Sequence, residues 1–237
     1  MYRIGIDLGG TNIVAGVVDD DYKIISAAKR KTNCPRSAEE IIADMAEVAK
    51  EAAEKAGLSM SDIESVGVGS PGAIDPINGV VCFSNNLEFY DVPMAEMLYK
   101  HLNKKIYIEN DANSAAYGEY IAGAGKGAEN FVAITLGTGV GGGIIIDGKI
   151  YSGSNYAGAE IGHTVICMGG EGCTCGRQGC FEAYASATAL IRQTKQAMIR
   201  YPESKMWDMC GGDIRNVSGK TAFDAMRAGD GAGIEVA

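Results

Sequence analysis

The sequence of 237 residues lacks several features that mark common classes of protein. It contains no apolar stretch near the roughly 20 residues that a membrane helix requires, so no membrane association is expected. It also lacks a basic run, and its formal net charge of −9 argues against binding to nucleic acid. Because Met1 is followed at once by the strand-like segment Tyr-Arg-Ile-Gly-Ile-Asp, no signal peptide is expected either.

Cysteine usage favours a reducing compartment. The chain has seven cysteines, an odd number, and three of them form a compact C-x-C-x4-C cluster at 173–180. A secreted disulfide framework is the alternative, but it suits shorter chains with an even cysteine count. We therefore expect a cytoplasmic protein with one metal site.

Short strands and helices alternate through the first half of the chain. Ser37 and Glu40 have the spacing of a capping box, which predicts a helix that ends near Gly57. Asp111 is expected to cap a helix of small residues. Strands are predicted at 2–7, 13–19, 24–31, 65–70 and 106–110, and further helices at 94–102, 183–200 and 221–227.

Two segments of the chain resemble each other. Residues 4–19 and 133–148 both read as a strand, a Gly/Thr-rich turn, a second strand and an aspartate. This repeat predicts a duplicated fold with two like α/β domains, at 1–122 and 123–237. The alternative is that two Gly-rich hairpins arose independently. Only about a hundred residues follow Ala124, so the second domain is expected to be incomplete.

The two Gly-rich turns are candidate phosphate sites. D-L-G-G-T-N (7–12) and L-G-T-G-V-G-G-G (136–143) can each present clustered backbone N–H groups to an anion. Neither matches a P-loop or a dinucleotide-binding fingerprint, and a tight hairpin turn alone would also explain the glycines. Two such turns in a repeated domain favour one bound nucleotide, with Asp7 able to hold Mg²⁺.

The segment E-N-D-A-N (109–113) supplies a candidate catalytic group. Asp111 stands where a strand gives way to a helix, a frequent position for functional side chains in α/β folds. Its carboxylate could accept the proton of an alcohol that attacks a phosphoryl group. A plain helix-capping aspartate is the alternative.

The stretch from Ala157 to Glu182 predicts a zinc site. Its candidate ligands are His163, Cys173, Cys175 and Cys180. Zinc prefers such imidazole and thiolate donors, and four protein ligands leave no position for a reactive water, so the metal would be structural. Glu160 and Glu182 flank the ligands and are not needed to bind the ion. A structural knuckle remote from any active site is the alternative.

These motifs occur in the order and spacing of the ROK family, and the sequence most resembles the bacterial glucokinases within it. The resemblance implies an actin-like, hexokinase-type (ribonuclease H-like) α/β fold with a cleft between two domains. It also implies ATP-dependent phosphorylation of a hexose such as glucose. Dimers are common in that family, which makes a homodimer one expectation.

The resemblance also implies roles for individual residues. Asp111 would be the catalytic base, and His163 would hold zinc through one ring nitrogen and a sugar hydroxyl through the other. The implied sugar-binding residues are Gly72, Asn86, Asn110, Asp111, Glu160, His163 and Glu182. Those implied to face ATP phosphates and Mg²⁺ are Asp7, Gly9, Gly10, Thr11, Asn12, Gly137, Thr138 and Gly139.

The sequence departs from the family pattern at its end. Members of the family continue with a Gly-rich adenosine-binding segment and a final helix, and neither is recognisable here. Three alternatives stay open: a sugar-sensing regulator of the same family, a non-catalytic sugar-binding zinc module, and a kinase for another hexose or N-acetylhexosamine. The regulator is less favoured because no helix-turn-helix precedes the strand at Tyr2.

Overall fold

The computed structural model describes residues 1–237, which form two compact units. The first comprises Met1–Ala133 and Gly143–Ala159, and the second Ile134–Gly142 and Glu160–Ala237. This division differs from the predicted boundary between residues 122 and 123. Segments after residue 123 belong to the first unit because they pack on helix residues before it. A Cβ at Gly143 would overlap the Ala116 side chain, and one at Gly148 would lie 3.4 Å from the Tyr120 hydroxyl.

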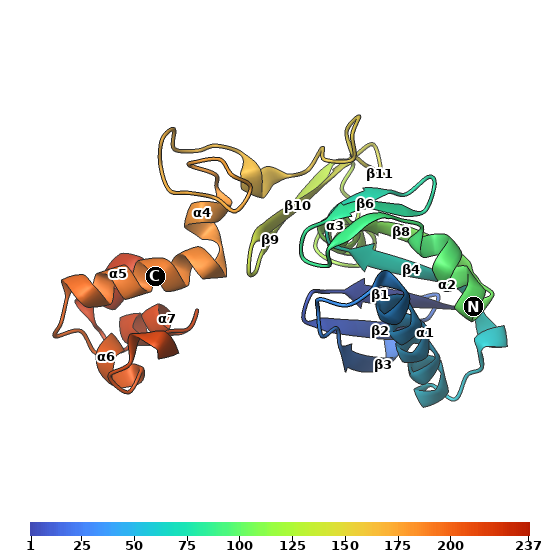
Figure 1. Cartoon of the computed structure of the whole chain (residues 1–237), viewed down its shortest axis with the longest axis horizontal. Helices are drawn as coiled ribbons and strands as arrows, with labels where there is room; N and C mark the ends of the chain where they lie inside the picture. The colour runs from blue at the N-terminus through green and yellow to red at the C-terminus, as the bar shows by residue number, and fades with distance from the viewer. The chain divides into compact units, whose positions relative to one another are not determined.

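A five-stranded sheet forms the centre of the first unit, in the order β3-β2-β1-β4-β8 (Figure 1). Strands β1 and β2 pair antiparallel, as do β2 and β3, whereas β1 and β4, and β4 and β8, pair parallel. The parallel pairs bring the carboxyl ends of β1, β4 and β8 to one edge of the sheet. The strands span Tyr2–Leu8 (β1), Asn12–Val18 (β2), Ile24–Lys31 (β3), Ile63–Ser70 (β4) and Lys105–Asn110 (β8).

Helices α1 (Ala38–Lys55) and α2 (Met94–Leu102) share one hydrophobic core with the sheet, and a short helix, η1 (Met60–Asp62), precedes β4. The predicted capping box is confirmed, since the Ser37 side chain accepts from the Glu40 N–H and Glu40 accepts in return. The predicted cap of α3 (Asp111–Ala122) is wrong by one residue. Asn110 is the cap, and its side-chain oxygen accepts from two helix N–H groups.

Two small sheets of short strands complete the architecture. The first, which the sequence did not reveal, consists of β5 (Ala73–Asp75), β6 (Val80–Ser84) and β7 (Phe89–Val92). The second has the order β11-β10-β9. Its strands are β9 (Phe131–Leu136), β10 (Val140–Ile146) and β11 (Lys149–Ile150).

The second unit is mostly helical. Its elements are η2 (Ile161–His163), α4 (Glu182–Ala185), α5 (Ala187–Arg200), α6 (Met206–Met209), η3 (Ile214–Asn216), α7 (Thr221–Arg227) and α8 (Gly231–Val236). The predicted helix at 183–200 is therefore two helices. It breaks because Ser186 adopts an extended conformation and caps α5, its hydroxyl accepting from the Ala189 N–H.

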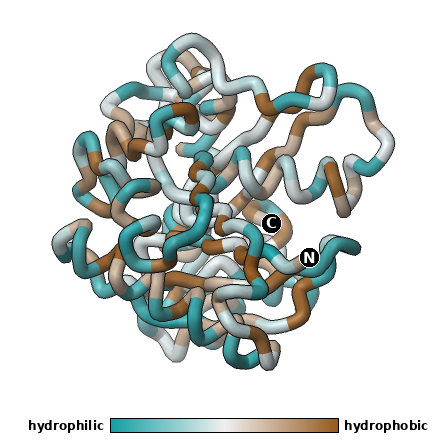
Figure 2. Tube along the Cα trace, turned by 90° about the vertical axis from the view of Figure 1, so that its right-hand side faces the viewer, coloured by the Kyte–Doolittle hydropathy of each residue, from teal (hydrophilic) through white to brown (hydrophobic).

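Apolar residues occur along the trace in short stretches separated by polar ones (Figure 2). Accordingly, no helix has both the length and the apolar character to span a bilayer.

Candidate active site and metal centre

The first predicted phosphate turn follows β1 and is closed by a hydrogen bond from the Gly9 N–H to the Asn12 carbonyl (2.9 Å). Thr32, which directly follows β3, anchors the turn. The Thr32 N–H donates to the Thr11 carbonyl (3.0 Å), and its hydroxyl donates to the Gly9 carbonyl (2.6 Å). The Thr32 side chain is fully buried. Sequence reasoning missed this residue, although it directly follows a predicted strand that ends beside the turn.

Asp7 and Asp111 interact electrostatically within the first unit. The pKa of Asp7 is raised, first because the surrounding protein partly desolvates its carboxylate and second because the Asp111 charge is nearby. Both side chains line a groove of about 590 Å³ on the face of the sheet. Glu109 is the third acidic residue of the lining. Two neighbouring carboxylates such as Asp7 and Asp111 can divide two tasks, one holding a cation and the other accepting a proton.

Predicted sugar-binding residues lie beside these groups in the same unit. The Asn110 side-chain NH₂ donates to the Gly72 carbonyl (3.1 Å). Gly72 has a φ of 110°, and a Cβ there would overlap the backbone of Phe83, so only glycine fits this turn. Asn86 is exposed and lies against Gly10 of the phosphate turn. The structure therefore brings Gly72, Asn86, Asn110 and Asp111 close to the first turn.

Asn12 has a side-chain oxygen that is buried without a hydrogen-bond partner. A buried polar atom of this kind is costly unless a ligand or water satisfies it. An amide presents either its oxygen to a hydrated cation or its NH₂ to a phosphate oxygen. The first turn thus fits a phosphate with its metal ion.

The second predicted phosphate turn joins β9 and β10 in the second unit, where the Gly137 N–H donates to the Gly139 carbonyl (2.9 Å). The start of α5 anchors it, because the Ala187 N–H donates to the Gly137 carbonyl (2.8 Å) and the Thr188 hydroxyl to the Thr138 carbonyl (2.8 Å). Thr188 was not predicted, since no sequence pattern links it to a residue 50 positions away.

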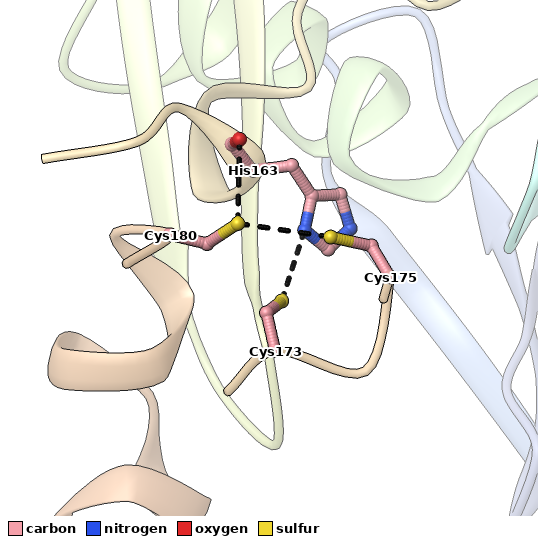
Figure 3. A group of neighbouring side chains, drawn as sticks. All are labelled: His163, Cys173, Cys175 and Cys180. Carbon is pink, nitrogen blue, oxygen red and sulfur yellow. Dashed lines mark hydrogen bonds between the residues drawn. The ribbon is translucent and has the colours of Figure 1, made fainter. Parts of the chain in front are cut away.

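His163, Cys173, Cys175 and Cys180 form one cluster, with ligand atoms all within 4.8 Å of one another. Their side chains converge on a common point (Figure 3). His163 Nδ1 is 3.5 Å from Cys173 Sγ, and Cys175 Sγ is 3.6 Å from Cys180 Sγ. A tetrahedral zinc with Zn–S of about 2.3 Å and Zn–N of about 2.1 Å has ligand-to-ligand edges of about 3.5–3.8 Å. The cluster therefore fits zinc.

Metal binding at the cluster would be coupled to the loss of a thiol proton. Burial raises the pKa of the Cys180 thiol to about 11, and a metal ion would have to displace that proton in order to bind. His163 directs Nδ1 into the cluster, which leaves Nε2 on the other side of the ring for a second partner.

The two flanking glutamates differ in their surroundings. Glu160 is exposed, and its backbone carbonyl accepts from the His163 N–H (3.1 Å). Glu182 is partly buried at the first position of α4, and its Oε2 accepts from the Val140 N–H (3.0 Å) beside the second turn. The second unit thus holds Glu160, Glu182, the four predicted zinc ligands, and Gly137, Thr138 and Gly139.

The sequence profile of the ROK family matches residues 3–236. The chain belongs to the ROK family. A glucokinase from Thermotoga maritima is 41% identical over 231 residues, which cover 96% of this chain and 70% of that protein. The structure of a ROK glucokinase from Streptomyces griseus, in complex with glucose and AMPPNP, superposes with a TM-score of 0.84 at 38% identity and covers 100% of this chain and 74% of that one.

These matches confirm the predicted mixed α/β fold of the ROK hexokinase type and place the chain with the sugar kinases of the family. It spans 61–71% of the lengths of four glucokinases that it matches. A xylose repressor from Bacillus subtilis is 32% identical over 85% of this ROK chain and 53% of the repressor.

Proposed function

We propose that this ROK-family protein is an ATP-dependent hexose kinase that phosphorylates the 6-hydroxyl of glucose, with Asp111 as general base. The observation that carries the proposal is the placement of Asp111 beside Asp7, in one groove and next to the first phosphate turn. Phosphoryl transfer requires a base near the attacking hydroxyl and a cation-binding group near the phosphates.

Asp111 is suited to accept a proton. It occupies the first helical position of α3 and is exposed, because Asn110 takes over the capping of that helix. One Asp111 oxygen, Oδ1, lies 2.8 Å from the Ala112 N–H. The other oxygen can take the hydroxyl proton as the oxygen attacks the γ-phosphorus.

The rest of the proposed chemistry is positioning and charge neutralisation. Asp7 would hold Mg²⁺, which offsets the negative charge of the phosphates when it is bound. The N–H groups of the two Gly-rich turns, with Thr11, Asn12 and Thr138, would orient the phosphate oxygens. Gly72, Asn86, Asn110, Glu160, His163 and Glu182 would surround the sugar hydroxyls, each of which both donates and accepts. Zinc would keep its structural role.

The Asp111→Asn variant tests the proposal. Asparagine has nearly the same shape but cannot accept the proton, so glucose phosphorylation should fall by about 10²–10⁴-fold. Glucose binding, measured by calorimetry, should stay within a few-fold of wild type. An unchanged turnover would refute the role of Asp111. A zinc- and Mg·ATP-supplied wild-type protein that phosphorylates no hexose would refute the kinase itself.

The identity with xylose repressors keeps a sugar-responsive regulator as the second candidate. It predicts sugar binding without turnover and binding to operator DNA by the purified protein. A panel of glucose, mannose, fructose and the N-acetylhexosamines in a coupled assay would separate the two and would define the preferred hexose.

A further inference from the structure

The second phosphate turn is linked to the predicted zinc loop by one carboxylate. Glu182 Oε2 accepts from the Val140 N–H (3.0 Å), directly after the turn. A Cβ at Gly139 would overlap this carboxylate, so the backbone of the turn lies directly against Glu182. Through these two contacts, at Gly139 and Val140, the Glu182 carboxylate limits where the backbone of the second phosphate turn can lie.

The other oxygen of Glu182 faces the cysteine loop. Glu182 Oε1 lies 3.3 Å from the Thr174 hydroxyl and 3.8 Å from Cys173 Sγ. The Thr174 hydroxyl donates to Oε1, and this is the shorter of the two contacts from the loop. Thr174 stands between two predicted ligands, Cys173 and Cys175, so a bound zinc would fix it on both sides.

A second contact joins the same regions. Gly162 directly precedes the ligand His163, and a Cβ at Gly162 would overlap the Val140 carbonyl. The backbone next to His163 therefore also packs against Val140, the residue directly after the second turn. Both sides of the metal cluster are thus in contact with Val140, one directly and one through Glu182.

We propose that zinc orders the second phosphate turn through Thr174 and Glu182, which act as positioning residues for nucleotide binding. A bound zinc would fix Thr174, whose hydroxyl donates to Glu182 Oε1, while Glu182 Oε2 accepts from the Val140 N–H. Each oxygen keeps a second lone pair for the proposed sugar contact. The importance for nucleotide binding rests on the proposed kinase function. The ordering of the turn does not, because it can be measured without nucleotide.

Hydrogen exchange on the full chain tests the ordering. In zinc-loaded wild type, the Val140 amide should be protected, and stripping the zinc with a chelator should speed its exchange several-fold. Thr174→Val replaces the hydroxyl with a methyl group of similar size and should give the same faster exchange while zinc content stays at one per chain. Thr174→Ser restores the hydroxyl and should restore protection. Thr164→Val is the control, because the exposed Thr164 side chain has no hydrogen bond to Glu182.

Binding of Mg·ATP is the second readout. Loss of a hydrogen bond to a charged group should weaken binding of Mg·ATP to the Thr174→Val variant by about 10-fold, with the Ser variant near wild type. The inference is overturned if zinc-free protein or zinc-loaded Thr174→Val protects Val140 as well as wild type does. If wild type binds no Mg·ATP, the kinase proposal and the nucleotide-binding role fail together, and the exchange result still decides whether zinc orders the turn.

Discussion

The side-chain amide of Asn110 connects the start of α3 to Gly72, a residue 38 positions earlier in the sequence. The same side chain caps the helix through its oxygen, which accepts from the N–H groups of Ala112 (2.9 Å) and Asn113 (3.1 Å). One residue therefore fixes both the first turn of α3 and the loop at Gly72. Asp111 lies directly after it, so its position depends on both contacts.

Replacing Asn110 with alanine should destabilise the protein and misplace Asp111. Loss of the cap costs about 1–2 kcal/mol, which should appear as a lower midpoint in urea unfolding. Asn110→Asp is the matched variant, because aspartate keeps the capping oxygen but cannot donate to Gly72. It should be more stable than the alanine variant yet show a similar loss of turnover. Equal stability of the two variants would mean that the cap contributes little.

The pH dependence of Asp7 provides a second test. Desolvation and the charge of Asp111 raise its pKa, so removing that charge in Asp111→Asn should move the Asp7 pKa down toward its usual range. Carbon-detected NMR titration of the Asp7 carboxyl would measure this shift. An Asp7 pKa that is the same in the variant and the wild type would show that the two carboxylates do not interact.

The same shift predicts how Asp7 affects stability. A carboxyl with a raised folded pKa favours the folded state while it is protonated. Its stabilising contribution is complete below the unfolded pKa and is lost as the pH rises through the folded pKa. At pH 7 the ionised Asp7 should therefore slightly destabilise the folded state. Asp7→Asn should raise the midpoint of urea unfolding and weaken Mg·ATP binding. At pH 3 the difference in stability should disappear.

The parts of the fold that could be predicted from sequence are those set by local spacing. The capping box at Ser37 and Glu40 and the gathering of His163 with the three cysteines were both predicted, because their residues lie close together in the chain. The strands that precede the Gly-rich turns were predicted from their alternation and the glycines that follow.

Other features depend on contacts that a single sequence does not display. Thr32 anchors the first turn only because β3 pairs with β2, and Thr188 reaches the second turn from 50 residues away. The strands β5, β6 and β7 have three to five residues each, too few for a periodic pattern. The cap of α3 was assigned to Asp111 instead of Asn110 because both residue types favour that position, and only the backbone conformation separates them.

Asp230 is a predicted determinant of stability in the second unit. It is buried and accepts from the Ser204 hydroxyl (3.0 Å), the Lys205 N–H (2.9 Å) and the Gly233 N–H (2.8 Å). Burial alone would raise its pKa, but these hydrogen bonds outweigh burial and the pKa is lowered. Asp230→Ala leaves several donors without an acceptor and should cost about 1–3 kcal/mol in urea unfolding at pH 7.

The contribution of Asp230 should also depend on pH. Because its folded pKa is depressed, the stabilisation is present above the unfolded pKa and is lost as the pH falls through the folded pKa. The difference in unfolding free energy between wild type and Asp230→Ala should therefore decrease as the pH drops below about 4. Asp208→Ala is the control, because Asp208 is an exposed aspartate of the same unit. A difference in unfolding free energy that stays constant between pH 7 and pH 3 would show that the charge of Asp230 does not cause the stabilisation.

Removing zinc should weaken sugar binding as well as stability. His163 directs Nδ1 into the His/Cys cluster, and the proposed sugar contact uses Nε2 of the same ring, so a bound zinc would fix both the tautomer and the orientation of the donor. Cys175→Ser removes one ligand without touching His163 and should lower zinc content, the unfolding midpoint and glucose affinity together. Calorimetry with glucose on chelator-treated and zinc-reconstituted protein measures the effect, and reconstitution should restore affinity in wild type only. A zinc-free protein that stays folded and binds glucose with unchanged affinity would show that the metal centre has no part in the sugar site.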